Sequence, residues 1–255
     1  MARHNGQMSI TVELLDGVDA DARACAVFDR VWAGGPEVVP VDLAAAITHM
    51  GGYLAVAVID GRDVGASLGF RGWHNGPVLH SHATCAEVPG AGLALKIHQR
   101  AWARAQGIPA ITWTFDPLVR RNAYFNLVKL GADIKELLPN FYGEMTDAIN
   151  IGDESDRLLA WWDTSHDSPG TSLEISDAHI ALADTDGTPE YCDFAPGRAN
   201  LVVLPEDIEA LRAAGSPTVP LWRRAVRDVL SSALENNWRI AGMNGREAYV
   251  LVEAT

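Results

Sequence analysis

Hydrophobic and polar positions in the first third of the chain follow a pattern that predicts one strand, two helices and then three antiparallel strands. The first strand is expected at 9–15, where apolar and polar side chains alternate. The helices are expected at 19–32 and 41–50, each followed by glycines. The later strands are expected at 53–59, 64–73 and 78–85, with turns at Asp60-Gly61 and His74-Asn75-Gly76-Pro77.

The pattern changes after residue 86. A run without helix breakers from Gly90 to Gln106 predicts a long helix that ends at Gly107. The elements expected next are a strand at 110–115, a helix at 119–130 and strands at 132–138 and 141–145. This order predicts an α/β (α+β) fold, in which a mixed, largely antiparallel twisted sheet is flanked by helices.

The last third of the chain differs in composition. Residues 163–200 are rich in Asp, Ser, Thr, Gly and Pro, so we expect an acidic loop or linker. Beyond it, the pattern predicts a strand at 201–204, a short helix after Pro205, a helix at 219–236 and a hairpin of 238–243 with 248–253. The expected organisation is a main domain at 8–162, the linker at 163–200, and a C-terminal α/β extension at 201–255 that packs on the main domain.

Charge narrows the classes of partner. The 255 residues carry 20 Lys and Arg against 33 Asp and Glu, a formal net charge of −13, which disfavours nucleic acid and membrane surfaces. Residues 88–135 are an exception with seven basic and two acidic side chains, and they leave room for a small anionic ligand. No apolar stretch reaches the roughly 18 residues of a membrane span, and the polar N-terminus lacks a signal-peptide core. Three widely spaced cysteines fit a reducing compartment, so a cytoplasmic location is expected.

The segment Glu87-Val88-Pro89-Gly90-Ala91-Gly92-Leu93-Ala94 lies between a predicted strand and a predicted helix. Two glycines one residue apart allow the backbone to turn tightly and to present consecutive N–H groups at the positive end of the helix. A pyrophosphate fits that geometry. A plain turn between strand and helix accounts for the glycines equally well.

The order of elements, the glycine turn and two later segments together resemble the GCN5-related N-acetyltransferase (GNAT) superfamily. The later segments are Arg121-Asn122-Ala123 and Lys129-Leu130-Gly131-Ala132. The stretches 96–107, 111–118 and 138–145 resemble more closely a branch of predicted acyltransferases with a C-terminal extension. The resemblance covers residues 9–162 and extends more weakly beyond them. It implies that the glycine turn cradles the pyrophosphate of acetyl-CoA or another acyl-CoA, used as a cosubstrate. The cofactor-binding residues that it implies are Val88, Gly90, Ala91, Gly92, Leu93, Ala94 and Asn122.

Two positions depart from the pattern of that superfamily. Glu87 stands where relatives carry Gln or Arg, and a carboxylate there would repel a pyrophosphate unless it points away. Leu127 stands where many relatives carry a tyrosine that protonates the departing thiolate. Leucine cannot donate a proton, and the neighbouring Asn126 can only form hydrogen bonds.

Acyl transfer to an amine needs a base for the ammonium proton and an acid for the thiolate. His80 and His82 share one face of the strand before the glycine turn, so either is a candidate base, the alternative being hydrogen-bonded core or surface histidines. Tyr142 and Glu144 share a face of the strand expected at 141–145, where one could donate and the other accept a proton. The alternative for them is a packed tyrosine and a solvated glutamate.

The resulting hypothesis is a CoA-dependent N-acyltransferase, with acetyl or succinyl donors, that acts directly on the amine of a small molecule such as an amino acid. The alternative is a protein of the same fold with a binding or structural role, or with a different reaction. His80, His82 and Cys85 lack further ligands in a suitable pattern, so no metal is expected. The P-loop motif is absent from the sequence. The assembly state stays open, with a homodimer as one option.

Overall fold

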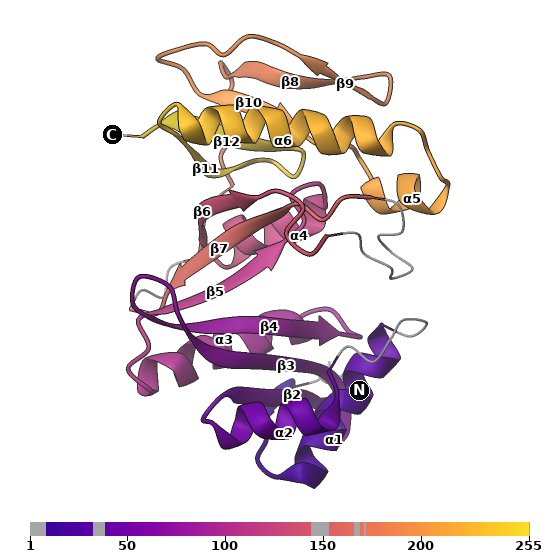
Figure 1. The fold of residues 1–255 in the computed structure, drawn as a ribbon, viewed down its shortest axis with the longest axis vertical. Coiled ribbons are helices and arrows are strands. Elements are labelled where there is room, and N and C mark those ends of the chain that lie inside the picture. Colours follow the sequence, from indigo (N-terminus) through magenta and orange to yellow (C-terminus); the bar gives the residue numbers. More distant parts are fainter. Residues whose placement is uncertain (1–8, 33–38, 144–152, 166–168, 171, 255) are drawn as a thin grey trace, which may run out of the picture. The chain divides into compact units, whose positions relative to one another are not determined.

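The computed structural model describes residues 9–32, 39–143, 153–165, 169–170 and 172–254 (Figure 1). The chain forms two compact units. The first consists of residues 1–112 with 163–165, and the second of 113–162 with 166–255. Strand β5, Ala110–Phe115, begins in the first unit and ends in the second. This division differs from the three parts expected from sequence composition, whose boundaries stay a prediction.

The first unit is an antiparallel sheet of four strands, with the start of β5 parallel to β4. Its elements are β1 (Thr11–Leu14), α1 (Val18–Val31), α2 (Val41–His49), β2 (Tyr53–Ile59), β3 (Arg62–Trp73), β4 (Pro77–Ala86) and α3 (Ala91–Ala105). All seven were expected from the sequence to within about two residues. The alternating patterns and the glycine-containing turns are local signals, and the structure follows them.

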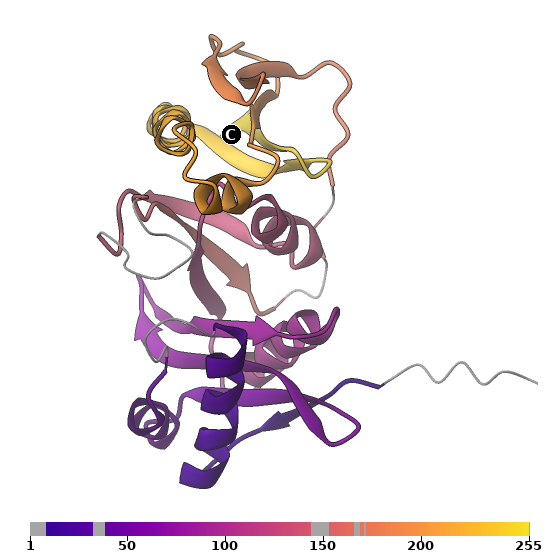
Figure 2. The same ribbon diagram turned by 90° about the vertical axis from the view of Figure 1, so that its right-hand side faces the viewer.

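Both faces of this sheet are covered, as Figure 2 shows. Leu54 and Val56 of β2 point into a core built with Phe28 of α1 and Ala44 of α2. Tyr53, which alternates with Leu54, points to the opposite face and contacts Trp102 of α3, with ring centroids 5.3 Å apart. The sheet is therefore buried on both sides, and α3 lies on the face opposite to α1 and α2.

The second unit contains the end of β5 and two layers of later elements. Its first elements are α4 (Arg120–Tyr124), a π-helical turn (Phe125–Lys129), β6 (Asp133–Leu138) and β7 (Arg157–Asp163). The remaining ones are β8 (His179–Thr185), β9 (Thr188–Tyr191), β10 (Asn200–Val203), α5 (Ile208–Ala213), α6 (Val219–Glu235), β11 (Trp238–Asn244) and β12 (Ala248–Glu253). The last five strands form a second sheet in the order β11-β12-β10-β8-β9, with β10 parallel to β8.

Helix α6 lies along the second sheet (Figures 1 and 2). Trp222 on this helix is fully buried, and its indole N–H donates to the carbonyl of Gly187 in the β8–β9 turn at 3.1 Å. With mixed sheets and packed helices in both units, the fold is α+β, as the element order predicts.

Two parts of the sequence-based prediction are wrong. The stretch 163–200, expected to be a loop, contains the strands β8 and β9, of which β8 carries a short apolar run at 180–183 and β9 is largely polar. The strand expected at 141–145 is a turn at Phe141–Gly143, while residues 144 and 145 lie outside the described part of the chain. Strand β7 was not expected, since its nearly continuous apolar run carries no alternation.

Candidate functional site

The glycine turn forms the junction between β4 and α3. Gly90 occupies the position before the helix with a φ of 90°, in the left-handed region that glycine tolerates best. No side chain caps this helix, and the first N–H groups of a helix have no acceptor within it. The structure thus brings the predicted residues Val88, Gly90, Ala91, Gly92, Leu93 and Ala94 into one turn at a positive helix end.

Glycine occupies positions 90 and 92 for different reasons. A side chain at Gly90 would strain the backbone because of its positive φ. At Gly92 an added Cβ would lie 3.8 Å from the Cβ of Ala86, which is an ordinary contact. The fold itself therefore does not require glycine at position 92, and a close approach by a ligand would explain it.

Glu87 is neutralised by two arginines of its own unit. Its carboxylate accepts from Arg30 of α1 at 3.1 Å and from Arg62 of β3 at 2.8 Å. Arg30 first, and Arg62 with it, hold the pKa of this carboxyl below its ordinary value. The negative charge that departs from the superfamily pattern is therefore paired at the base of the turn.

His80 and His82 lie together on the face of β4 that carries Phe70 of the neighbouring strand. Their ring centroids are 6.5 Å apart, and those of His82 and Phe70 are 5.9 Å apart. Leu68 and Gly69 of β3 pair with Ala83 and Ser81, so His82 is the extra residue of a β-bulge.

The two histidines differ in environment. Burial, aided by the charges of His82 and Lys96, lowers the pKa of His80 to about 4, and its Nδ1 lies 3.3 Å from the hydroxyl of Thr112. Burial also lowers the pKa of His82, but this residue is exposed at the bulge. A histidine with a pKa of about 4 is a weak base, so His82 is the better candidate to take a proton at neutral pH.

A polar network lies on the opposite face, between β4 and α3. Lys96 is 4% exposed and donates to the Ser81 hydroxyl at 2.8 Å and to Gln99 Oε1 at 3.5 Å. Gln99 in turn donates to Ser67, whose hydroxyl lies 2.8 Å from that of Thr84. Burial lowers the pKa of Lys96 to about 7. The sequence pattern does not indicate this buried group, because a lysine on an amphipathic helix ordinarily faces solvent.

The remaining predicted catalytic residues belong to the second unit and are not gathered there. Asn126 is buried, and its amide oxygen accepts from the indole N–H of Trp113 at 3.1 Å. The exposed Tyr142 has its hydroxyl 3.0 Å from that of Thr114. Trp113 and Thr114 are neighbours on β5 and point to opposite faces, so Asn126 and Tyr142 lie on opposite faces as well.

The two remaining predicted site residues are Asn122 and Glu144. Asn122 lies on α4, half-buried, and its backbone N–H donates to the carbonyl of Val119 at 3.0 Å. Glu144 lies outside the described residues, so the pairing expected between it and Tyr142 remains a prediction.

A buried ionic cluster in the second unit was also missed. Asp116 and Asp153 together accept hydrogen bonds from Arg212 and Arg223, at distances of 2.6 to 3.2 Å. Asp116 also caps the turn after β5 by accepting from the N–H of Leu118 at 2.9 Å, as its place after the strand suggests. The ion pairs join residues far apart in the chain, so no local pattern indicates them.

Several features bear on what the chain can bind. Among the described residues, no group of three or more His, Cys, Asp or Glu side chains is placed to hold a metal ion. Within the same ranges, none of the helices has the length and apolar character needed to cross a bilayer. The three cysteines are not joined in disulfides.

Comparison with known proteins gives structural likenesses only. No family model and no curated protein matches the chain. It is similar to an acetyltransferase of the GNAT family from Streptococcus pneumoniae, with 12% identity, a TM-score of 0.48, and coverage of 61% of this chain and 99% of that one. The ribosomal-protein-S18-alanine N-acetyltransferase of Escherichia coli gives 13% identity, a TM-score of 0.48, and coverage of 63% and 97%. A GNAT family acetyltransferase from Elizabethkingia anophelis with acetyl-CoA bound gives 16% identity, a TM-score of 0.40, and coverage of 60% of this chain and 97% of that one. Values this low say nothing of activity or site residues.

Proposed function

We propose that the chain is an acyl-CoA-dependent N-acyltransferase that transfers an acetyl or succinyl group directly to the amine of a small molecule. The observation that carries the proposal is the turn at Gly90 and Gly92, where no side chain caps the helix end and neither residue has a Cβ that would keep a ligand from the backbone. The pairing of Glu87 with Arg30 and Arg62 supports it, because the one carboxylate at the turn is neutralised. The sequence resemblance to the GNAT superfamily points in the same direction.

The proposed reaction forms an amide and releases a thiol. The substrate ammonium gives a proton to His82 and becomes a nucleophilic amine. The amine nitrogen attacks the thioester carbonyl, and collapse of the tetrahedral species breaks the carbon–sulfur bond. The thiolate leaves with the electron pair of that bond and takes up the proton that the attacking nitrogen releases as it becomes the amide nitrogen. The products are the N-acyl compound and CoA.

Binding of the cosubstrate is tested by calorimetric titration with CoA and acetyl-CoA. The sharpest variant is Gly92→Ala, because the fold accepts the extra methyl group while a ligand held closely against the backbone does not. We expect the affinity for CoA to fall about tenfold or more, as for the loss of a charge-assisted hydrogen bond. Thermal stability should stay unchanged or rise. Absence of CoA binding at millimolar concentration would overturn the proposal.

The role of His82 is tested by following thiol release over a panel of amines. His82→Ala should lower kcat by about 10² or more if the residue acts as general base. The matched control is His49→Ala, which removes an exposed histidine of α2 in the same unit and should leave kcat unchanged. Equal activity of the two variants would remove His82 from the mechanism.

The second candidate function is a binding or structural role without acyl transfer. The buried Leu127 favours it, since this position offers no proton donor. Binding of CoA without thiol release over the whole amine panel would support this candidate over the first.

A further inference from the structure

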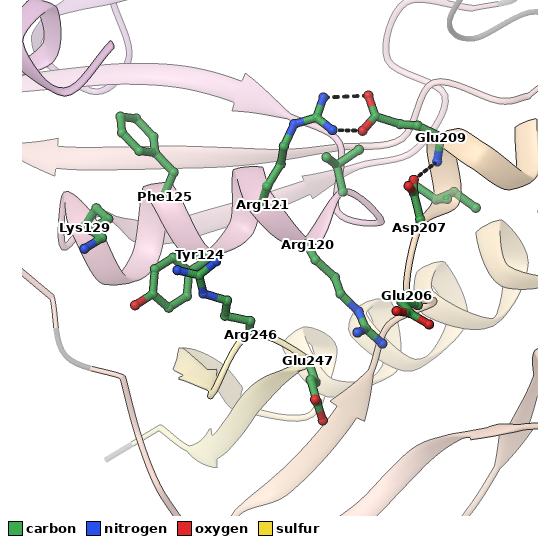
Figure 3. Close-up of a pocket in the computed structure, with 12 residues that line it drawn as sticks. Arg120, Arg121, Tyr124, Phe125, Lys129, Glu206, Asp207, Glu209, Arg246 and Glu247 are labelled. Atoms are coloured by element: carbon green, nitrogen blue, oxygen red, sulfur yellow. Dashed lines mark hydrogen bonds and ion pairs between the residues drawn. The ribbon is translucent and has the colours of Figure 1, made fainter. Parts of the chain in front are cut away.

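The second unit contains a pocket that the proposed reaction does not use. It has a volume of about 500 Å³, which is within the range of small-molecule sites. Its walls come from α4 and the following turn, the segment before α5, and the β11–β12 turn (Figure 3). All of these elements belong to the second unit.

Part of the charge in the pocket is already committed to the fold. Arg121 makes two parallel hydrogen bonds to the carboxylate of Glu209, one of them at 2.7 Å. Asp207 accepts from the backbone N–H groups of Glu209 and Ala210 at the start of α5. Arg120 donates to the carbonyl of Leu204. The contacts of Arg121, Glu209 and Asp207 are drawn as dashed lines in Figure 3 and shape the walls. Arg120 keeps an Nε that has no hydrogen-bond partner among the described residues.

Two cations that form no ion pair with a described residue lie beside one aromatic ring. The guanidinium carbon of Arg246 lies 4.6 Å from the ring centroid of Tyr124, and the Lys129 ammonium lies 5.9 Å from the same centroid. A guanidinium stacked on a ring keeps its N–H donors in its own plane, where they can bind a carboxylate. This part of the wall, named here the basic end, is therefore suited to a carboxylate.

Two uncommitted carboxylates line the same pocket. Within the described part of the chain, neither Glu206 nor Glu247 forms an ion pair with a basic residue. Figure 3 shows both drawn away from Tyr124 and Arg246, on the side toward which Arg120 extends. This part of the wall, the acidic end, is suited to an ammonium group. A simple anion would meet repulsion at one end and a simple cation at the other.

We propose that this pocket binds a small zwitterion, a free amino acid or a dipeptide, with its carboxylate on Arg246 and Lys129 and its ammonium group on Glu206 and Glu247. The separation of two positive from two negative side chains in one cavity is the pattern that complements such a ligand. The site does not rest on acyl transfer, and its occupancy is measurable without any CoA compound.

The test is calorimetric titration of the full chain with the twenty free L-amino acids and with L-alanyl-L-alanine. At least one of these probes should bind, and its N-acetylated form and its amide should each bind about tenfold more weakly, or worse. These two derivatives remove the ammonium and the carboxylate one at a time. No binding by any probe at millimolar concentration, or equal binding of the derivatives, would overturn the proposal.

Variants identify the pocket as the place of binding. Arg246→Gln should weaken the best probe about tenfold, and Glu247→Gln by a similar factor. The controls Arg224→Gln and Glu235→Gln remove exposed charges of α6 outside the pocket and should change nothing. In Arg246→Gln, conversion of the ligand carboxylate to an amide should cost less affinity than in the unchanged chain, because the two groups interact. Independent, additive losses would contradict the assignment, as would binding of inorganic phosphate that is equally sensitive to Arg246→Gln.

Discussion

A buried cation of the first unit, Lys96, and a buried cation of the second, Arg223, are in opposite electrostatic situations. Lys96 in the first unit is 4% exposed and donates to the hydroxyl of Ser81 and the amide of Gln99. Arg223 in the second unit is 2% exposed and donates to the carboxylates of Asp116 and Asp153. Burial lowers the pKa of Lys96 to about 7. Burial would also lower the pKa of Arg223, but the two carboxylates raise it instead.

These two side chains show separately how burial and how the chemistry of the hydrogen-bond partners affect a buried charge. Burial alone disfavours a charge in both places, and only carboxylate partners offset that cost. The first unit therefore holds a cation that releases its proton near neutral pH, and the second unit holds one that stays charged. The free energy of unfolding should therefore depend on pH in different pH ranges for the two units. Substitution of Lys96 and of Arg223 should change it by different amounts.

The largest effect is expected for Arg223→Met. This variant leaves Asp116 and Asp153 buried with Arg212 and with Arg157, which lies 3.9 Å from Asp116, so the free energy of unfolding should fall by about 3–5 kcal/mol. Urea unfolding measures the change. Arg224→Met, on the exposed side of the same helix, is the control and should stay within about 0.5 kcal/mol. A loss below about 1 kcal/mol for Arg223→Met would mean that the cluster is not coupled to folding.

The next effect concerns the pH dependence of the first unit. Unfolded lysine holds its proton up to its ordinary pKa of 10.5, but folded Lys96 only up to about 7, so the unfolded chain binds more protons between these values. Stability from this site must therefore rise with pH, by about 3 kcal/mol from neutrality to about pH 9.5. Lys96→Met lacks this dependence, and Lys135→Met, an exposed lysine on β6, should retain it. A difference between wild type and Lys96→Met that does not change with pH would contradict the lowered pKa.

The third effect appears in acid. Burial would raise the pKa of Asp116, but Arg223 and Arg212 lower it to about 2, against an ordinary value of 3.8. The resulting stability is present above the ordinary pKa and is lost as pH falls through the folded one. The gap in unfolding free energy between wild type and Asp116→Asn should therefore shrink by about 2 kcal/mol from about pH 5 to about pH 2. A constant gap over this range would show that Asp116 does not titrate with a lowered pKa.

The sequence predicted the parts of this molecule that depend on local signals. The turn at Gly90 follows from glycine spacing between a strand and a helix. Candidate residues on one strand were also placed correctly, because alternation puts His80 and His82 on one face.

What the sequence did not predict depends on contacts between distant segments. Arg223 reaches Asp116 across 107 positions, and Lys96 finds Ser81 only because α3 packs on β4. No periodicity encodes such pairs. The strand predicted around Tyr142 was wrong for a different reason. Its residues have high strand propensity. Asn140, however, adopts a φ of 45°, and the Tyr142 N–H donates to the Ser155 hydroxyl at 2.8 Å. Local propensity was overridden there by hydrogen bonds to a later segment.

The smallest effect is expected where ion pairs are exposed, and it isolates burial as the variable. Glu87 has two arginine partners, as Arg223 has two aspartate partners, but Arg30 and Arg62 are 45% and 71% exposed. Water and salt screen such pairs, so Glu87→Gln should lower the free energy of unfolding by less than about 1 kcal/mol, and by still less in high salt. Urea unfolding of Glu87→Gln and Arg223→Met at two salt concentrations measures the loss in the free energy of unfolding for each variant. A loss for Glu87→Gln as large as that for Arg223→Met would mean that the number of ion pairs, and not their burial, sets their weight.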